Sequence, residues 1–483
     1  MTNPITRTRT LALAALFSAA ALLAGCGGGD EVTVTLPGGA SATGTSGSSG
    51  TGAATGTTPR TTSNPTGPFA TPTLTITGPS RAIANTRYTY QAVATNATPS
   101  NYSWNWGDGS PNTAGSSAPK VWNKNGSFVG ALSASVFGTT LTGTASVAVV
   151  TPISVGNSHT CSLKTDTTVV CRGANNYGQL GNGTETNPAT TETLVVVAGL
   201  TGVTAVAVGG ESTCALKSDG TVACWGYNLF GKLGDGTSVN RSTSVAVTGL
   251  TNAVAISTTG TSACALKSDG SVVCWGFNGN FQLGNGMNVA SSVTTAVTGL
   301  TDAVAIASGS THSCALRSNG TVVCWGVNSG GGLGDGTTVN SSVTVAVVGL
   351  TDTVAISAGL NYSCALKSSG SMFCWGLNSH GQLGDGSTNS SSTPVAVSGL
   401  SNVIALGASG FFHNCALKSD GTVACWGRNT SGSIGDGTTI DRLTPTAVLG
   451  VTGAVAISSK HSVRTCAVKA DGTEVCWGVQ SNN

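Results

Sequence analysis

The sequence predicts an all-β protein in which a propeller of repeated four-stranded units follows a small antiparallel sandwich. Fourteen of its 15 cysteines form seven pairs, each spaced ten residues apart in a recurring phrase such as CALKSDGTVAC. The first cysteines of these pairs recur every 50 to 53 residues, a period typical of a solenoid, an array or a propeller. Residues 72–150 lack this phrase, and their alternating apolar runs between turn residues are typical of a sandwich.

The N-terminus predicts export. Arg7 and Arg9 precede an apolar run over residues 11–23, which ends in Leu23-Ala24-Gly25-Cys26. A charged start, an apolar stretch and a small-residue cleavage site form a secretory signal. The run is shorter than the roughly 20 residues needed to span a bilayer. We therefore expect residues 1–25 to be removed, and the rest to enter an oxidising compartment in which disulfides persist.

The phrase Leu-Ala-Gly-Cys resembles the lipobox of bacterial lipoproteins. This resemblance implies that Cys26 is lipidated and becomes the mature N-terminus. Cys26 is also the cysteine left over when the other fourteen pair. Gly27 stands where inner-membrane lipoproteins carry an acidic retention residue, which points to the outer membrane, on its periplasmic or surface side. The alternative is an ordinary secretory signal followed by a free Cys26.

The lipidated cysteine and a linker occupy residues 26–71. Residues 27–70 consist mainly of Gly, Ser, Thr and Ala, a composition that cannot bury enough apolar surface to order itself. As a flexible coil, this segment would hold its ends about 35–40 Å apart. We expect a disordered tether between the membrane and the folded part.

The sandwich region, residues 72–150, contains the string Trp104-Asn105-Trp106-Gly107-Asp108-Gly109. It resembles the W-x-F-G-D-G signature of polycystic-kidney-disease (PKD) type domains, with Trp106 in place of the usual aromatic residue. The resemblance implies an immunoglobulin-like sandwich. Asp108 lacks the alternating carboxylates of a calcium loop, so we interpret it as a turn-capping residue.

Each cysteine phrase predicts a β-hairpin. With Asp219 at the centre of the turn, Lys217 faces Thr221 and Cys214 lies opposite Cys224. Opposed Cβ atoms are about 4.5–5.5 Å apart, close to the roughly 3.8 Å of a disulfide. The alternative is seven pairs of buried free thiols, which the exported location disfavours. The predicted disulfides are Cys161–Cys171, Cys214–Cys224, Cys264–Cys274, Cys314–Cys324, Cys364–Cys374, Cys415–Cys425 and Cys466–Cys476.

One whole repeat, residues 354–400, contains four short strand-like runs, as a propeller blade requires. The dipeptide Trp-Gly, followed by a phrase such as Gly-Gln-Leu-Gly, appears in five successive repeats. It resembles the regulator-of-chromosome-condensation repeat family, and this resemblance implies a seven-bladed β-propeller over residues 151–483. The repeated tryptophans, which alternate with small alanines, are interpreted as packing between blades.

Both ends of the repeat array depart from the common pattern. The first repeat has Ser162 for Ala, Thr167 for the turn Gly and Arg172 for Trp, and terminal repeats are commonly atypical. The seventh repeat has no fourth strand of its own in the printed sequence. Either an upstream segment supplies this strand or the blade has three strands, and the pattern leaves both open.

The composition favours neither catalysis nor nucleic-acid binding. Removal of residues 1–25 leaves 19 basic side chains (21 minus Arg7 and Arg9) against 19 acidic ones, so no basic excess exists for a phosphate backbone. Aspartates repeat in turns and Gly-Asp-Gly loops, which indicates a role in the fold. The five histidines show no metal-ligand spacing, and three share one repeat position. We expect no catalytic residue, metal or cofactor. The histidines are His159, His312, His380, His413 and His461.

A binding surface is predicted on the rim formed by the first-to-second and third-to-fourth strand loops. Non-repeating aromatic side chains and one histidine gather there, and exposed aromatics often mark contact sites. The alternative is that these rings are buried under their own loops. The opposite rim carries a repeated basic residue, which we expect nearby aspartates to offset. The candidate binding residues are Tyr177, Phe230, Phe281, His380, Phe411 and Phe412.

Three functions are compatible with these features. The first is a lipid-anchored envelope protein, expected to be monomeric, whose propeller binds an unidentified protein or glycan without catalysis. The second is guanine-nucleotide exchange on a GTPase, the activity of the family's nuclear founding member, although export removes the usual partner. The third is an extracellular enzyme acting on polysaccharide, which a pair of non-repeating carboxylates on one rim would favour.

Overall fold

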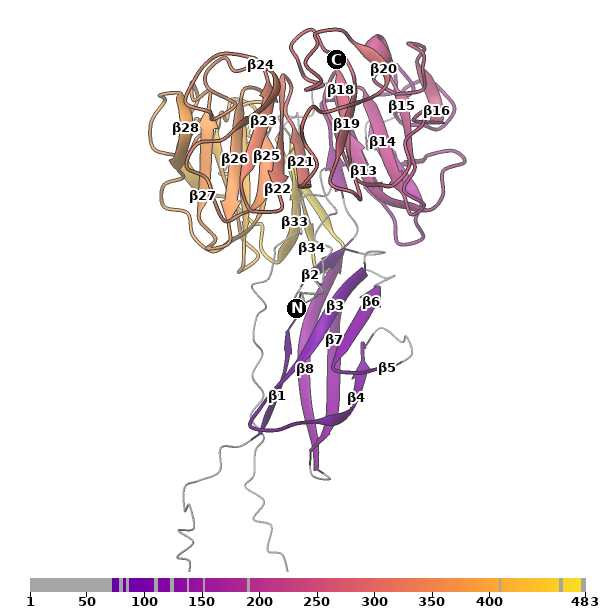
Figure 1. Ribbon diagram of the computed structural model, residues 1–483, viewed down its shortest axis with the longest axis vertical. Coiled ribbons are helices and arrows are strands. Elements are labelled where there is room, and N and C mark those ends of the chain that lie inside the picture. Colours follow the sequence, from indigo (N-terminus) through magenta and orange to yellow (C-terminus); the bar gives the residue numbers. More distant parts are fainter. Residues whose placement is uncertain are drawn as a thin grey trace, which may run out of the picture.

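The computed structural model describes residues 72–77, 81–83, 87–107, 112–121, 126–136, 139–150, 153–188, 192–407, 410–459 and 464–478. This part of the chain is all-β (Figure 1), apart from one 3-10 turn, η1, at Leu229–Gly231. No helix in the described part has the length and hydropathy that a membrane span requires. The predicted signal peptide, Cys26 and the linker lie outside the described residues.

Residues 73–150 form a three-stranded sheet, ordered β1-β3-β6, and a five-stranded sheet, ordered β2-β8-β7-β4-β5. All neighbouring strands are antiparallel except β2 and β8, which are parallel. The strands are β1 (Thr73–Thr77), β2 (Arg81–Ile83), β3 (Arg87–Thr95), β4 (Ser100–Asn105), β5 (Thr113–Ala114), β6 (Ser117–Val121), β7 (Gly126–Val136) and β8 (Thr139–Val150).

The two sheets share one apolar core, as a sandwich requires. Leu74 from one sheet and Leu132 from the other lie in the same buried cluster as Trp104 and Trp106. The two indoles stack with their centroids 5.2 Å apart. The indole N–H of Trp104 donates to the Gly115 carbonyl at 2.8 Å. The tryptophan motif therefore supplies the centre of the core, whereas Asp108 lies outside the described residues.

Residues 153–477 form seven sheets in the described part of the chain, numbered here 1 to 7 in chain order. Sheets 1 to 6 have four strands and sheet 7 has three. Sheet 1 contains β9 (Ile153–Val155), β10 (His159–Leu163), β11 (Val169–Gly173) and β12 (Val195–Val196). Sheet 2 contains β13 (Val203–Val208), β14 (Ser212–Lys217), β15 (Val222–Gly226) and β16 (Arg241–Ala246). Sheet 3 contains β17 (Ala253–Thr258), β18 (Ser262–Lys267), β19 (Val272–Gly276) and β20 (Ser291–Ala296).

The remaining sheets repeat this plan. Sheet 4 contains β21 (Ala303–Ser308), β22 (His312–Arg317), β23 (Val322–Gly326) and β24 (Ser341–Ala346). Sheet 5 contains β25 (Thr353–Ala358), β26 (Tyr362–Lys367), β27 (Met372–Gly376) and β28 (Ser391–Ala396). Sheet 6 contains β29 (Val403–Leu406), β30 (His413–Lys418), β31 (Val423–Gly427) and β32 (Arg442–Ala447). Sheet 7 contains β33 (Ala454–Ser458), β34 (Thr465–Lys469) and β35 (Glu474–Trp477).

The sheets stand side by side like the blades of a propeller (Figure 1). The innermost strand of each sheet contacts that of the next, from β9 through β13 to β33, and β33 contacts β9. The Ser458 hydroxyl in sheet 7 accepts from the Val155 amide in sheet 1 at 3.2 Å. The sandwich adjoins this pair of sheets through a contact between β8 and β33.

The register of each hairpin is the predicted one. In sheet 2, Cys214 lies opposite Cys224 and Leu216 opposite Val222, while the Lys217 amide donates to the Thr221 carbonyl at 2.9 Å. In each sheet, the disulfide joins the two cysteines that face each other across the second and third strands. The joined pairs are Cys161–Cys171, Cys214–Cys224, Cys264–Cys274, Cys314–Cys324, Cys364–Cys374, Cys415–Cys425 and Cys466–Cys476.

The tryptophans connect neighbouring sheets. Trp325 in sheet 4 is fully buried, and its indole N–H donates to the Gln282 carbonyl of sheet 3 at 2.8 Å. Two residues after Gln282, a Cβ on Gly284 would lie 2.8 Å from the indole Cδ1 atom. Gly284 also has a φ of +62°, a conformation that glycine adopts without steric cost. The Trp-Gly dipeptide and the phrase that ends in Leu-Gly, Gly-Gln-Leu-Gly in its common form and Phe-Gln-Leu-Gly in sheet 3, are therefore complementary halves of one contact between sheets.

Candidate binding surface

The loops divide between two ends of the sheets. The Tyr227 amide donates to the Glu211 carbonyl at 2.9 Å, so the third-to-fourth and first-to-second strand loops lie together at one end. We name this end the loop rim. At the other end, the Ser218 amide in a hairpin turn donates to the Gly202 carbonyl in the connection between sheets at 2.8 Å. We name this end the hairpin rim.

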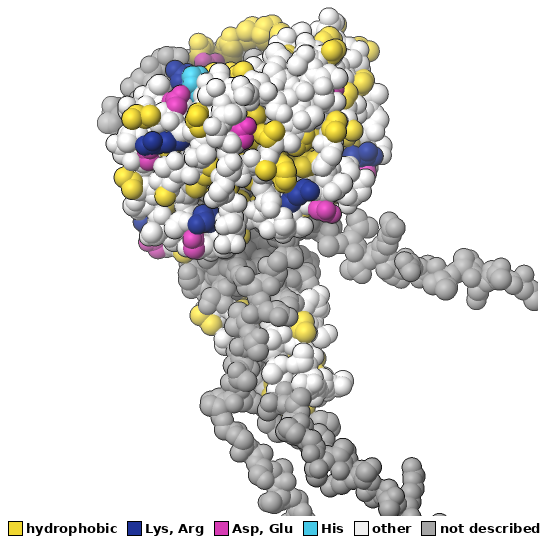
Figure 2. All heavy atoms as spheres, turned by 90° about the vertical axis from the view of Figure 1, so that its left-hand side faces the viewer, with side chains coloured by type: hydrophobic (Ala, Val, Ile, Leu, Met, Phe, Trp, Pro, Cys, Tyr) yellow, Lys and Arg dark blue, Asp and Glu magenta, His cyan; other side chains and the backbone are white. Residues whose placement is uncertain are grey.

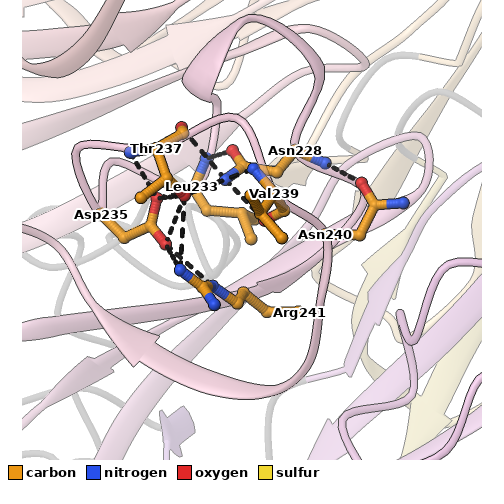
Figure 3. A network of polar contacts seen from close by, with 7 residues as sticks. All are labelled: Asn228, Leu233, Asp235, Thr237, Val239, Asn240 and Arg241. Carbon is orange, nitrogen blue, oxygen red and sulfur yellow. Dashed lines mark hydrogen bonds and ion pairs between the residues drawn. The ribbon is translucent and has the colours of Figure 1, made fainter.

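A buried asparagine organises the third-to-fourth strand loop of sheet 2 (Figure 3). Asn228 Oδ1 accepts from the Leu233 amide at 2.9 Å. Asn228 Nδ2 donates to the Val239 carbonyl at 2.9 Å and to Asp235 Oδ1 at 3.2 Å. Arg241 Nε donates to Asp235 Oδ2 at 2.9 Å. One amide side chain thus fixes both ends of the loop.

The same arrangement recurs in other sheets, which gives the loop-rim carboxylates a structural role. Burial alone would raise the pKa of Asp436, but hydrogen bonds from Arg442 and Thr438 lower it to about 2. The sequence analysis assigned the Gly-Asp-Gly loops to the fold and overlooked the asparagine. Its signal is an Asn two residues after the Trp-Gly or Arg-Gly dipeptide in each of the first six repeats. The equivalent buried residues are Asn175, Asn228, Asn278, Asn328, Asn378 and Asn429.

The hairpin rim carries the paired charges that the sequence predicts. The hydroxyl and amide of Thr221 donate to Asp219 Oδ1 at 2.6 and 2.9 Å, and the hydroxyl contact is the main reason that the pKa of Asp219 falls to about 2. Lys217 Nζ lies 3.1 Å from Asp219 Oδ2. Equivalent ion pairs join Lys267 to Asp269 and Lys418 to Asp420, and Arg317 pairs with Asp302.

On the loop rim, two predicted binding residues pack across the boundaries between sheets. The rings of Tyr177 in sheet 1 and Tyr227 in sheet 2 have centroids 4.6 Å apart. Phe230 in sheet 2 packs on Phe277 in sheet 3 at 4.8 Å, yet 41% of Phe230 remains exposed. These residues are therefore neither fully buried under their own loops nor isolated. The sequence analysis did not select Tyr227 and Phe277, which follow a Trp-Gly dipeptide directly.

Phe230 and Phe281 share a rare backbone conformation. Their φ angles are +63° and +65°, in the left-handed region that bulky residues seldom occupy. Phe281, which is half-buried, occupies the repeat position that holds a glycine of positive φ in sheets 1, 2, 4, 5 and 6. These glycines are Gly178, Gly231, Gly331, Gly381 and Gly432. A phenylalanine in such a position indicates a constraint other than local stability.

The structure brings His380 and Phe412 together. Their rings meet edge to face with centroids 5.3 Å apart. His380 Nδ1 lies 2.9 Å from Asp441 Oδ2, and the Arg428 guanidinium lies 5.5 Å from the Phe412 ring. Phe411 is half-buried beside Phe412. The predicted residues thus fall into two groups, one on sheets 1 to 3 and one on sheets 5 and 6.

The sequence analysis missed a ring of exposed aliphatic side chains on the loop rim. One stands near the end of the third-to-fourth strand loop in four sheets, where the surrounding loop is polar. On the face shown in Figure 2, hydrophobic side chains reach the propeller surface in small separate groups. The apolar residue three positions after the Gly-Asp-Gly or Gly-Asn-Gly phrase in these four repeats was a visible signal. The aliphatic residues and their exposures are Val239 (58%), Val289 (67%), Val339 (71%) and Ile440 (64%).

Three histidines lie within the contacts between sheets. The Ser363 hydroxyl donates to the Gly332 carbonyl at 3.1 Å, so it accepts from His312 Nε2–H at 2.7 Å. Burial lowers the pKa of His312 to about 4, of His413 to about 4 and of His159 to about 3. All three are therefore neutral structural groups at pH 7. His461 lies outside the described residues.

Among the described residues, no group of three or more His, Cys, Asp or Glu side chains is placed to hold a metal ion. In the part of the chain that the structure describes, the loop rim contains one buried lysine, Lys232, whose Nζ donates to the Gly260 carbonyl at 2.8 Å. Desolvation lowers the pKa of Lys232 to about 8. Its ammonium also lies 4.8 Å from the Tyr227 ring. Lys232 therefore connects sheets 2 and 3 within the structure.

Comparison with protein families identifies six regulator of chromosome condensation (RCC1) repeats in the chain. One model of this repeat matches residues 150–179, 203–232, 253–282, 303–331, 354–382 and 404–433. A second model of the same repeat matches residues 269–316 and 369–417. The matches cover the first three strands and the start of the loop-rim loop in sheets 1 to 6.

Solved structures show the same fold. Prp20p from Saccharomyces cerevisiae is 22% identical, with a TM-score of 0.57, over 64% of this chain and 80% of that chain. Human WBSCR16 is 20% identical, with a TM-score of 0.57, over 64% of this chain and 84% of that chain. Yeast RCC1 (Prp20) bound to Kap60 gives 22% identity and a TM-score of 0.56, over 64% of this chain and 78% of that chain. The repeated sheets are thus blades of an RCC1-type β-propeller.

Proposed function

We propose that this RCC1-repeat propeller is a non-catalytic binding module of the bacterial cell envelope, held to the outer membrane by a lipid on Cys26. Its loop rim binds a protein or a glycan. The seven sheets are the seven blades of a closed ring, and a PKD-like sandwich of immunoglobulin-like fold precedes them in the chain. The protein acts as a monomer, without a metal or cofactor.

The observation that carries the proposal is the pair of phenylalanines in left-handed backbone conformation on the loop rim. Phe230 is 41% exposed and Phe281 is half-buried. Left-handed backbone costs a non-glycine residue roughly 1–2 kcal/mol. At the Phe281 position the fold does not need this cost, because five other sheets have glycine there. Aromatic rings held rigidly at a surface lose little entropy on binding. The exposed aliphatic ring around them enlarges the apolar surface.

The ring contacts support seven blades. Each innermost strand touches the next, and β33 returns to β9. The Ser458 bond to Val155 joins sheet 7 to sheet 1. One apolar cluster also contains Ile153 of sheet 1 and Val468 of sheet 7. A hydrogen bond and a shared apolar core therefore join the last sheet to the first.

The disulfides support export. All seven hairpins carry a disulfide, for example Cys314–Cys324, and such bonds persist in an oxidising compartment. An envelope location and a lipidated Cys26 follow from the signal sequence and its lipobox. Replacement of Cys26 by Ser is expected to release the chain from the membrane fraction and to remove palmitate label. A mutant that still sediments with membranes, together with an unlabelled native chain, would contradict the anchor.

Two of the similar structures favour a protein ligand as the first class to test. The study of Prp20p concerns its binding to Gsp1p and histones, and the yeast RCC1 structure contains Kap60. At 22% identity the likeness shows the fold alone, so those partners belong to those proteins. Both structures are propellers of this type that bind other proteins, which supports testing a protein ligand first.

The proposal is tested by affinity capture with the mature chain against envelope extract and a glycan panel. Phe230→Ala combined with Phe281→Ala is expected to lower the affinity for the captured ligand at least tenfold, a loss of about 1.4 kcal/mol in binding free energy. The matched control is Val348→Ala, which removes an exposed apolar group (50% exposed) on the hairpin rim. Equal loss in both variants, or unchanged affinity in the phenylalanine variant, would reject the loop rim as the binding surface.

A further inference from the structure

Among the residues that the structure describes, no strand pairs with the outer edge of sheet 7. In sheets 1 to 6 a fourth strand pairs with the third, whereas β35 is the last strand of sheet 7 in the described residues. The consequence appears in its side chains. Cys476 and Trp477 are half-buried, while the equivalent Cys324 and Trp325 of sheet 4 are 0% exposed. An unpaired edge strand with exposed apolar side chains is a template for another strand.

The six fourth strands show what a strand at this edge must supply. In sheet 4, Val345 pairs with Cys324 and Ala346 with Val323. The Val347 amide then donates to the Val322 carbonyl at 3.0 Å, and its side chain is buried. Two residues later Gly349 has a φ of +70°. The required phrase is thus an alternating Val-Thr-Val strand, a buried aliphatic residue and a glycine.

The N-terminal segment contains this phrase. Residues 32–38 read Val-Thr-Val-Thr-Leu-Pro-Gly, and residues 343–349 of sheet 4 read Val-Thr-Val-Ala-Val-Val-Gly. Leu36 falls at the buried aliphatic position, and Thr35 falls at the exposed position of Ala346. Around this segment, residues 37–70 are mostly Gly, Ser, Thr, Ala and Pro, so the phrase stands out from its surroundings.

Pro37 is compatible with the same alignment. It corresponds to Val348, whose amide donates to the Gly334 carbonyl of the loop rather than to the neighbouring strand, at 2.9 Å. A proline there removes no hydrogen bond between strands, which is the usual condition for proline in a sheet. Val348 is also 50% exposed, so the ring of Pro37 would have room.

We propose that residues 31–36 bind antiparallel to β35 as the fourth strand of sheet 7. By the register of sheet 4, Val34 lies opposite Cys476 and Thr35 opposite Val475, and the Leu36 amide donates to the Glu474 carbonyl. Residues 39–71 then connect this strand to β1. When extended, these 33 residues span about 100 Å. This span exceeds the length of the sandwich, whose longest strand, β8, has 12 residues and is roughly 40 Å long.

Strand addition also changes the geometry of the anchor, a consequence that rests on the proposed lipid at Cys26. A fourth strand begins at the loop rim, as β24 does after the Asn328 loop. Four residues separate Cys26 from Glu31, which limits their distance to about 18 Å. The loop rim would then lie next to the membrane, and residues 39–71 would be a loop instead of a spacer.

The test is hydrogen exchange, followed by mass spectrometry, on the full mature chain. The native chain is expected to protect both residues 31–36 and the peptide over residues 472–478. Val34→Pro places a residue without an N–H in the middle of the added strand, and exchange over residues 472–478 is expected to accelerate about tenfold or more. The matched control, Thr45→Pro, carries the same new residue farther along the segment and is expected to exchange like the native chain.

Three results would overturn the proposal. Equal exchange over residues 472–478 in the native chain and Val34→Pro would show that this segment does not cover β35. Protection lost on dilution would assign the edge to a second copy of the chain. Protection of the edge that survives removal of residues 27–38 would assign it to another segment. Lipid on Cys26 is measured separately by intact mass, so the failure of one proposal is distinguishable from failure of the other.

Discussion

Contacts between consecutive sheets, the regular seams, differ from the contact between sheets 7 and 1, the closing seam. In a regular seam a tryptophan such as Trp325 is fully buried against Gln282 and Gly284 in the loop of the preceding sheet. In the closing seam the same repeat position holds Arg172. Its Nη2 lies 3.1 Å from Glu474 Oε2 of sheet 7, and its Nε lies 3.4 Å from Glu192 Oε2.

The closing seam has no tryptophan because a buried indole requires two specific contacts in the neighbouring sheet. An indole requires a glycine that leaves room for its ring and a carbonyl that accepts its N–H. The described part of sheet 7 presents β35 and no such loop to sheet 1, so a charged, hydrogen-bonding side chain takes the position. Ser162 completes the change, since its hydroxyl donates to Glu474 Oε1 at 2.8 Å. In the described part of the chain, six seams are therefore centred on an indole, and in the seventh an arginine with its ion pairs takes the place of the indole.

Loss of a tryptophan from a regular seam should have the largest effect. Trp325→Ala is expected to lower the free energy of unfolding by about 3–5 kcal/mol, because it leaves a cavity between two sheets. Urea denaturation, followed by circular dichroism, measures the change. Trp325→Phe keeps most of the buried surface and should lose clearly less. Equal losses in the two variants would mean that the indole hydrogen bond, and not the packing, holds the seam.

The sequence predicted the hairpins of the regular repeats well. The ten-residue cysteine spacing fixed the hairpin register, because only one pairing places Cys214 opposite Cys224. The three departures of the first repeat were visible, but their reasons were not. Arg172 and Ser162 meet Glu474, more than 300 residues away. Thr167 keeps the turn's positive φ of 68° without a glycine.

The candidate site was less predictable. Sequence placed six residues on one rim but could not say which rings meet, since Tyr227 and Phe277 belong to neighbouring sheets. The left-handed φ of Phe281 was implicit in the repeat alignment, where five other sheets have glycine. That of Phe230 was less evident, because its repeat position has a positive φ in only one other sheet, at Gly330, and carries Tyr177 and His380 without one elsewhere.

Acid should weaken three regular seams. Because the pKa of His312 is about 4 in the folded state and 6.5 as its ordinary value, only the unfolded chain takes up a proton between these values. Stability is therefore complete above pH 6.5 and falls as pH decreases toward 4. The loss is about 2 kcal/mol for each such histidine at pH 5. His159 and His413 behave alike.

Urea denaturation at pH 7, 6 and 5 measures this loss. His312→Ser is the matched variant, because sheets 2 and 3 carry Ser212 and Ser262 at the same position. Below pH 6.5, the unfolding free energy of this variant should fall less steeply with decreasing pH than that of the native chain. The difference in slope should be about 1.4 kcal/mol per pH unit. An unchanged slope would show that His312 is protonated in the folded state. Turn carboxylates such as Asp219, whose pKa is about 2, titrate outside this window.

The closing seam should respond to salt, and the regular seams should not. Glu474→Gln is expected to lower the free energy of unfolding by about 1–2 kcal/mol, between the values for exposed and buried ion pairs. In 1 M NaCl the Debye length falls to about 3 Å, so this difference should shrink. The loss caused by Trp325→Ala should stay the same. Urea midpoints with and without salt measure both.

A second variant sharpens the same contrast. Arg172→Trp restores the residue that the other repeats carry, yet we expect it to destabilise the ring, because no Gly-x-Leu-Gly phrase of sheet 7 receives the indole among the described residues. It also leaves Glu474 with one partner fewer. A gain in stability would show that the closing seam differs from the regular seams by sequence alone and not by its geometry.

The smallest effect on stability is expected at the loop rim, where Phe281→Gly restores the residue of five other sheets. Relief of the left-handed strain, roughly 1–2 kcal/mol, is offset by the entropy that glycine gains in the unfolded chain, about 0.5–1 kcal/mol, and by lost ring contacts. The net change in unfolding free energy should therefore be within about 1 kcal/mol, while affinity for the captured ligand falls. Phe281→Ala removes the ring but keeps the strain, so it should be the less stable of the two. If Phe281→Gly instead destabilises the protein as strongly as a seam variant, the ring belongs to the loop core, and the left-handed backbone at Phe281 serves packing and not binding.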